Sequence, residues 1–340
     1  MAQQHLDPTD PAAGPSPTGG ALADYLRAQA TEFLRALRQH RESGSGGNGT
    51  AESADAARAL RRSVRRVSGS LHTFRPLLES EWSEGLRPEL AWVSGTLTME
   101  HACAARLERL LLALHRLSGT AVFPAQAGGP AAPERGNLTV GAAKAGALLE
   151  RQLTLARTRA HSSALQALGS SRFHGVADKV AVLASEVPLT SADADLRPLA
   201  RAAEERLADA VAALPLVTAG HPYNAEALVH GLSPDPAPHP QDAPWHQVRL
   251  LLRLHRYALE VLHGGDGPVD VRLLTAGQAL DRHRDASEAA AAAAAAARTP
   301  RIAPATAYAL GVLHADQRHE VEAARFAFQQ CWQKQALRTP

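Results

Sequence analysis

The sequence is organised around residues 245–257, which read WHQVRLLLRLHRY. Four cationic residues in this stretch recur at helical spacing and fall within about 80° of one helix face. They are His246, Arg249, Arg253 and Arg256. The opposite face is apolar, and no acidic residue occurs between Asp242 and Glu260. The stretch therefore predicts an amphipathic helix with an unneutralised cationic face that can bind a polyanion, although many charged helix faces only contact water.

A second stretch, over residues 54–79, predicts another helix with a cationic face. Its arginines repeat the spacing of the first three cationic residues above, at an offset of 188 residues. They are Arg58, Arg61 and Arg65, and Arg66 follows directly. No acidic residue lies between Asp55 and Glu79. Repetition at this scale suggests a duplicated helical unit, and two matched faces favour an anion site more than one face does.

The composition favours an all-α protein. Ala, Leu and Arg dominate, aromatic residues make up 4% of the 340 residues, and no period-2 alternation is long enough for a sheet. A net charge of +2 is small for this length, so an anion site must come from local clustering. The N-terminus lacks a signal-peptide pattern, no apolar run has membrane-spanning length, and the two cysteines give no disulfide framework. We therefore expect a cytoplasmic protein that does not contact a membrane.

The chain divides into a tail and one large helical region. We expect a disordered tail over residues 1–19, which is rich in Pro, Gly, Asp and Gln, and a helical domain over residues 20–338. Thr190 or Ser191 is expected to cap the helix that ends near residue 214. The alanine run at residues 289–297 predicts a helix that packs weakly, because alanine buries little surface. The expected loops cover residues 41–53, 122–137 and 230–244.

No enzyme or metal motif is present in the sequence. It has no glycine-rich phosphate loop ending in Gly-Lys-Ser/Thr, no Gly-x-Ser-x-Gly elbow and no His-Glu-x-x-His. His314 and His319 fall about 140° apart on a helix, which is too far for one ion. His255 falls among apolar positions and is expected to be a hydrogen-bonded core histidine. We therefore expect no catalytic residues, no cofactor and no metal site.

Several spaced blocks resemble the CHAD family, the "conserved histidine α-helical domain". One block is His-x-x-Arg-x-x-x-Arg-x-x-Arg-Tyr, which begins at His246 and precedes a Leu-x-x-His-x-Asp segment at residues 280–285. In the first half, the arginines at positions 61, 65 and 66 lead to FRPLL at residues 74–78. The segments SSRFHGVADKVAVL and ALGVLHADQR are also similar. The resemblance covers about residues 20–337.

This resemblance implies a fold and a ligand. The fold is two pseudo-repeated helical-bundle halves, at about residues 20–168 and 169–338, around a basic cavity. The ligand is inorganic polyphosphate, and some members associate with polyphosphate granules. Nucleic acid is not expected as a partner, because the net charge is modest and few aromatic residues are available for base stacking. The residues expected to line the polyphosphate path are Arg58, Arg61, Arg65, Arg66, His246, Arg249, Arg253 and Arg256.

The first half departs from the family pattern and is partly degenerate. Arg58 stands where the family has its first histidine, Ser68 replaces an arginine, and HACA at residues 101–104 replaces an Arg-Asp-x-Asp-like element. The alternative function is a degenerate helical scaffold or protein-interaction module without an anion ligand. A nucleic-acid binder and a phosphohydrolase are two more hypotheses, but a phosphohydrolase needs acidic metal ligands that the sequence does not identify.

Overall fold

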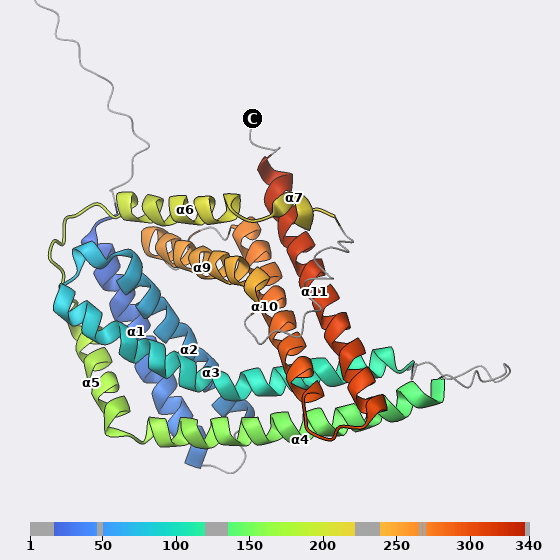
Figure 1. The fold of residues 1–340 in the computed structure, drawn as a ribbon. Coiled ribbons are helices and arrows are strands. Elements are labelled where there is room, and N and C mark those ends of the chain that lie inside the picture. The colour runs from blue at the N-terminus through green and yellow to red at the C-terminus, as the bar shows by residue number, and fades with distance from the viewer. Residues whose placement is uncertain are drawn as a thin grey trace, which may run out of the picture. The chain divides into compact units, whose positions relative to one another are not determined.

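The computed structural model describes residues 17–45, 50–119, 135–221, 239–264, 267 and 270–336. Within these ranges the chain is helical and forms no strand, which confirms the all-α prediction (Figure 1). The long helices are α1 (Gly19–Ser45), α2 (Thr50–Thr73), α3 (Ser80–Leu117), α4 (Arg135–Leu168), α5 (Ser171–Ser185), α6 (Arg197–Ala212), α9 (Ala243–His263), α10 (Val271–Ala297) and α11 (Pro304–Ala336). Shorter helical turns are η1 (Arg75–Leu77), α7 (Leu216–Ala219) and η2 (Pro240–Asp242).

The chain forms two compact units that alternate along the sequence. Unit 1 comprises Met1–Leu90, Ala177–Glu204 and Tyr257–Gly267. Unit 2 comprises Ala91–Val176, Glu205–Arg256 and Pro268–Pro340. Helices α3, α5, α6 and α9 each begin in one unit and end in the other, so the chain changes unit inside helices. The division into halves at residues 20–168 and 169–338, and their pseudo-repetition, remain predictions.

In unit 1 the helices α1 and α2 pack against each other. Apolar residues at helical spacing form the contact, and they are fully or almost fully buried. On α1 these include Leu22, Leu26 and Phe33, and on α2 they include Leu60, Val64 and Leu71. Isolated backbone bridges from Leu78 to Leu189 and from Thr18 to Asp195 hold the connecting segments of this unit.

The predicted cap at Thr190 or Ser191 is wrong, because α6 begins only at Arg197. The backbone N–H of Thr190 instead donates to the carbonyl of Leu77 at 3.0 Å, so this segment pairs with the chain just before α3. The side chain of Asp195, two residues before α6, accepts from the backbone N–H of Arg197 at 3.0 Å and so satisfies one donor of the first turn. Tertiary backbone hydrogen bonds therefore outweigh the local capping signal.

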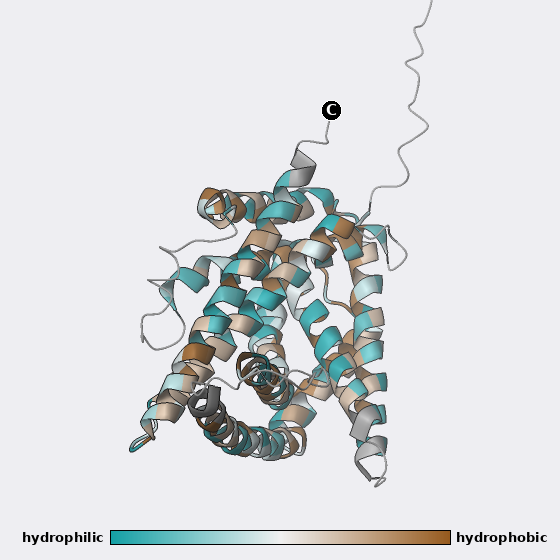
Figure 2. Ribbon diagram, turned by 90° about the vertical axis from the view of Figure 1, so that its right-hand side faces the viewer, coloured by the Kyte–Doolittle hydropathy of each residue, from teal (hydrophilic) through white to brown (hydrophobic). Residues whose placement is uncertain are grey.

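Unit 2 is built on the pair α10 and α11, which run side by side (Figure 1). One buried cluster joins this pair to α3 and α4, and a second joins it to α6, α7 and α9. Figure 2 shows hydrophilic and hydrophobic residues alternating along single helices, as expected where each helix buries one side. The second cluster holds the apolar face of α9, and its position fixes where the cationic face of that helix points.

The alanine run at the end of α10 packs closely, so the prediction of weak packing is wrong. Ala289, Ala293 and Ala296 are completely buried in the cluster with α3, α4 and α11. Small side chains let neighbouring helices approach until their backbones nearly touch. The pair α4 and α11 shows how close: a Cβ atom on Gly141 would lie 2.3 Å from the carbonyl oxygen of Ala305. For the alanine run itself, complete burial of these three residues shows that it is part of the core.

The predicted loops are shorter than expected wherever the structure describes them. Helix α1 continues to Ser45 and α2 begins at Thr50, inside the predicted 41–53 loop. Likewise α4 begins at Arg135 and α9 at Ala243. Once a helix has formed, each added residue gains a hydrogen bond, so helices extend into glycine- and serine-containing ends. Most of the predicted tail and the middle of each predicted loop lie outside the described residues.

Candidate functional site

The first turn of α9 is anchored in the core of unit 2 by Trp245. This side chain is 1% exposed. Its ring stacks on His283 of α10, with 5.6 Å between centroids, and meets Phe328 of α11 edge-on at 5.8 Å. Val248 and Leu252 continue the buried face one and two turns later. This packing leaves the cationic residues of α9 on the side that is only partly buried.

Asp242, directly before α9, is a buried carboxylate held by two arginines of α11. Arg318 donates from Nη1 to Oδ2 at 2.8 Å and from Nη2 to Oδ1 at 3.2 Å. Arg325 donates from Nη2 to Oδ1 at 2.6 Å. Burial alone raises the pKa of Asp242, but interactions with His283 and Arg318 hold it well below its ordinary value. The start of α9 is therefore fixed to α11 by a buried, ionised group.

His283 is a neutral histidine in this buried network. Burial lowers its pKa to about 4, and the positive charge of Arg325 acts in the same direction. In the unfolded chain the histidine pKa is near its ordinary 6.5. Between these two values the unfolded chain binds a proton that the folded chain does not bind. The contribution of neutral His283 to the free energy of unfolding is thus fully present above pH 6.5 and is lost as the pH falls towards 4.

We expect the free energy of unfolding to fall by about 2 kcal/mol between pH 7 and pH 5 because of His283. Urea denaturation at the two pH values measures this change. In His283→Gln the dependence should be flatter by that amount, whatever the variant's stability at pH 7. The exposed His174→Gln should keep the wild-type dependence, and an equal slope in wild type and His283→Gln would contradict the assignment.

His246 is the first predicted site residue, and it is half-buried beside the network. Its ring lies edge-on to that of His283, with 5.4 Å between centroids. Burial lowers the pKa of His246, the charge of Asp242 raises it, and that of Arg249 lowers it, with a net decrease. The neutral form is favoured, so this residue offers an anion a hydrogen bond more than a charge at neutral pH.

The three arginines of the α9 face are all half-buried. Elsewhere on this helix Val248 and Ala258 are fully buried, whereas Leu250 is 46% exposed. Arg249 donates from Nε to Asp281 Oδ1 of α10 at 2.6 Å. Arg256 lies against Gly277 of α10: a Cβ atom added to Gly277 would lie 3.7 Å from Nη1 of Arg256. Together with Arg253, these side chains and His246 line one side of α9 within unit 2. His255 is 6% exposed, which confirms that it is a core residue.

In unit 1 the predicted arginines lie on α2. Arg61 and Arg65 are half-buried, and the exposed Arg58 forms an ion pair with Asp55 one turn earlier. Arg66 contacts Glu260 with two nitrogens, Nε at 2.7 Å and Nη2 at 3.3 Å. The hydroxyl of Tyr25 donates to the same carboxylate at 2.8 Å. Glu260 thus links α1, α2 and the end of α9, and Arg66 has a structural role in this unit.

The prediction of an unneutralised face on α9 is wrong for Arg249. Along the helix itself no acid lies between Asp242 and Glu260, as the sequence indicates. The neutralising carboxylate, Asp281, comes from α10, 32 residues further along the chain. A tertiary ion pair of this kind leaves no trace in the periodicity of one helix.

Sequence reasoning missed Arg318 and Arg325, which are 3% and 5% exposed. The signal that could have found them is their spacing: they lie two turns apart on the face of α11 that also carries Val321 and Phe328. An arginine on a buried face needs a buried acid. Asp242, which the sequence marks only as the start of a helix, is that acid.

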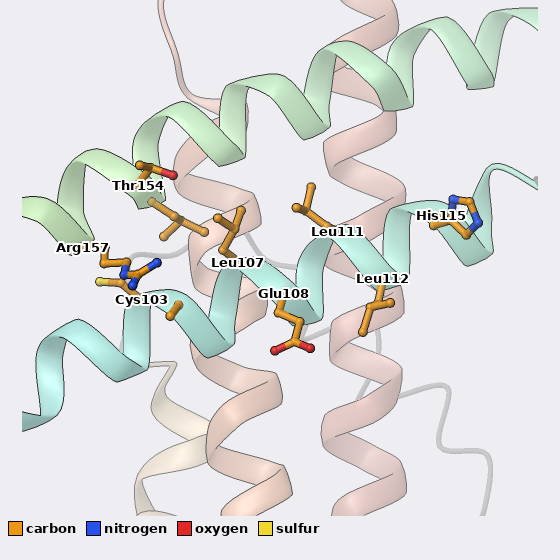
Figure 3. A pocket seen from close by; sticks show the side chains of 10 residues that line it. Cys103, Leu107, Glu108, Leu111, Leu112, His115, Thr154 and Arg157 are labelled. Carbon is orange, nitrogen blue, oxygen red and sulfur yellow. The ribbon is translucent and has the colours of Figure 1, made fainter. Parts of the chain in front are cut away.

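A pocket of about 510 Å³ lies between α3 and α4 in unit 2 (Figure 3). Leu107 and Leu111 of α3 point toward α4, which contributes Thr154 and Arg157. The lining is mainly apolar and includes no residue of the predicted polyphosphate path. The basic cavity that the resemblance implies therefore remains a prediction.

Two further features concern the described ranges as a whole. No helix there is long and apolar enough to cross a membrane. In the same ranges, His, Cys, Asp and Glu side chains do not gather in groups of three or more that could hold a metal ion.

Comparison with known proteins places the chain in a family. The model of the CHAD domain matches residues 28–291. The solved structure of PptA from Streptomyces chartreusis is 71% identical, with a TM-score of 0.78, and the match covers 94% of this chain and 100% of that one. The CHAD domain from the plant Ricinus communis matches at 17% identity and a TM-score of 0.48, over 95% of this chain and 97% of that one. No curated protein matches. The family match covers most of the sequence, and the chain therefore belongs to the CHAD family.

Proposed function

We propose that this protein binds inorganic polyphosphate without catalysing a reaction. The CHAD family is associated with polyphosphate binding. The proposed contacts are the two predicted cationic faces, one on α2 in unit 1 and one on α9 in unit 2. We further propose a cytoplasmic location with association with polyphosphate granules.

The observation that carries the proposal is the α9 face. Its four cationic side chains are partly exposed along about three helical turns, while Trp245, Val248 and Leu252 of the same helix are buried in the core. A polyphosphate chain has a charge at each phosphate, and guanidinium groups bind such oxygens through charge-assisted, often bidentate, hydrogen bonds. A rigid helix that presents a row of these groups suits a linear polyanion better than a single small phosphate.

The test is a titration with long-chain polyphosphate at 50 mM and 200 mM salt. If four phosphates are neutralised, each contributes about −0.7 to the slope of log affinity against log salt, so affinity should fall roughly 50-fold. A salt-independent affinity would contradict an electrostatic site. Absence of binding at low salt would favour the helical scaffold without an anion ligand.

Two controls distinguish polyphosphate binding from nucleic-acid binding and from phosphate hydrolysis. Single-stranded nucleic acid, added at equal phosphate concentration, should compete poorly, since aromatic side chains for base stacking are few. Incubation with magnesium or manganese should release no phosphate. Release of phosphate would instead support a phosphohydrolase.

A further inference from the structure

Helix α10 carries a row of carboxylates that face arginines. Asp281, Asp285 and Glu288 follow one another at i, i+4 and i+7, which places them on one side of the helix. All three, together with the arginines they contact, belong to unit 2. We call these three residues the acidic row.

Every member of the acidic row is in an ion pair. Asp281 accepts from Arg249 of α9 at 2.6 Å, and Asp285 accepts from Arg284 at 2.7 Å. Glu288 accepts from Arg106 of α3 at 2.6 Å and lies 3.6 Å from Arg284. Arg249, a residue of the predicted polyphosphate path, thus meets a protein carboxylate where a polyanion would otherwise meet it.

The field of the acidic row extends over the predicted site. Burial lowers the pKa of Arg284, but Asp285, Glu288 and Asp281 raise it, with a net increase. The charge of Glu288 also opposes the decrease that burial causes in the pKa of His246. The row therefore neutralises part of the cationic face that α9 presents.

Asp281 is the member that a ligand can displace. Its side chain is 59% exposed, whereas that of its partner Arg249 is 17% exposed. An exposed carboxylate that turns into water loses little, because pairs at the surface are weak. Arg249 stays in place when this happens, since it is largely packed against its neighbours.

We propose that Asp281 is an internal competitor for Arg249, which a bound polyphosphate must displace, and so sets the affinity of the α9 face. The inference rests on the proposed function and identifies a residue that lowers the affinity of the same site for polyphosphate. It differs from a positioning role, in which Asp281 would hold Arg249 in the orientation that the ligand needs. The two roles predict opposite effects when the carboxylate is removed.

The test is Asp281→Asn, which removes the charge and keeps the size of the side chain. We expect long-chain polyphosphate to bind roughly fivefold more tightly at 50 mM salt. We also expect the slope of log affinity against log salt to become steeper by about 0.7, as for one added cationic contact. Asp281→Glu, which keeps the charge, should remain near the wild-type affinity.

Two controls show whether the effect belongs to the ion pair. Glu150→Gln removes one negative charge from an exposed position of α4 in the same unit and should change affinity much less. In an Arg249→Ala background, Asp281→Asn should change polyphosphate affinity no more than Glu150→Gln does, because the guanidinium group for which Asp281 and the ligand compete is absent.

Unchanged or weaker binding by Asp281→Asn would overturn the inference while the wild-type protein still binds. If neither protein binds polyphosphate, the proposed function itself fails, so the two failures are distinguishable.

Discussion

An Arg249→Ala/Arg253→Ala double variant is expected to lose polyphosphate affinity by about 100-fold or more. Each hydrogen bond to a charged group contributes about 1.5–3 kcal/mol, so two of them correspond to at least two powers of ten. The variant should still fold. Arg249 pairs with an exposed carboxylate, and loss of such a pair costs at most about 1 kcal/mol. Titration at 50 mM salt, with urea denaturation to check folding, measures both effects.

The matched control is Arg151→Ala/Arg159→Ala on α4. Both arginines are exposed, and their removal changes the net charge by the same amount in the same unit. We expect this control to lose only a fewfold in affinity, through the general field of the protein. If the α9 variant folds and binds like the wild type, α9 is not part of the site.

Replacing Asp242 with alanine is expected to lower the free energy of unfolding by about 3–5 kcal/mol. The carboxylate is 2% exposed and accepts from Arg318 and Arg325. Removing it leaves the buried guanidinium group of Arg318 without a carboxylate partner and Arg325 with only Glu322 as one. The cost of this unpaired buried charge is several times that of losing an exposed ion pair. Urea denaturation at pH 7 measures the difference. Asp281→Ala, at an exposed pair of the same unit, should cost at most about 1 kcal/mol.

A rescue variant tests the physical reason for the loss. Arg325 also pairs with Glu322 at 2.7 Å, so the rescue combines Asp242→Leu, Arg318→Met, Arg325→Met and Glu322→Gln and removes the four charges together. Well-packed apolar replacements of buried ion networks are often neutral or stabilising, so most of the lost stability should return. If the quadruple variant is as unstable as Asp242→Ala, the loss comes from packing around the network and not from unpaired charge.

Helical spacing predicted the features of this protein that lie within one helix. The two sides of α9 follow from residues 245–257 alone, and burial of His255 follows from its place among leucines. The family resemblance followed from spaced blocks, and the match to the CHAD domain confirms it. The contribution of the predicted arginines to anion binding remains a prediction.

The charged partners that sequence reasoning missed depend on contacts between helices. Asp281 neutralises Arg249 from another helix, and Glu260 pairs with Arg66 across 194 residues of sequence. The backbone pairing that moved the start of α6 to Arg197 is likewise long-range. Periodicity describes the faces of one helix, but it does not say which acid a face will meet in the folded protein.

The alternation of the two units along the chain limits how the protein can be divided. The chain changes unit between residues 90 and 91, 176 and 177, 204 and 205, 256 and 257, and 267 and 268. A fragment cut near residue 168 would lack two segments of unit 1 and much of unit 2. Neither fragment is expected to fold alone, because each lacks segments of both units. A truncation that ends the chain before residue 257 therefore removes segments of both units. Insertions are expected to be tolerated best in the loops between helices.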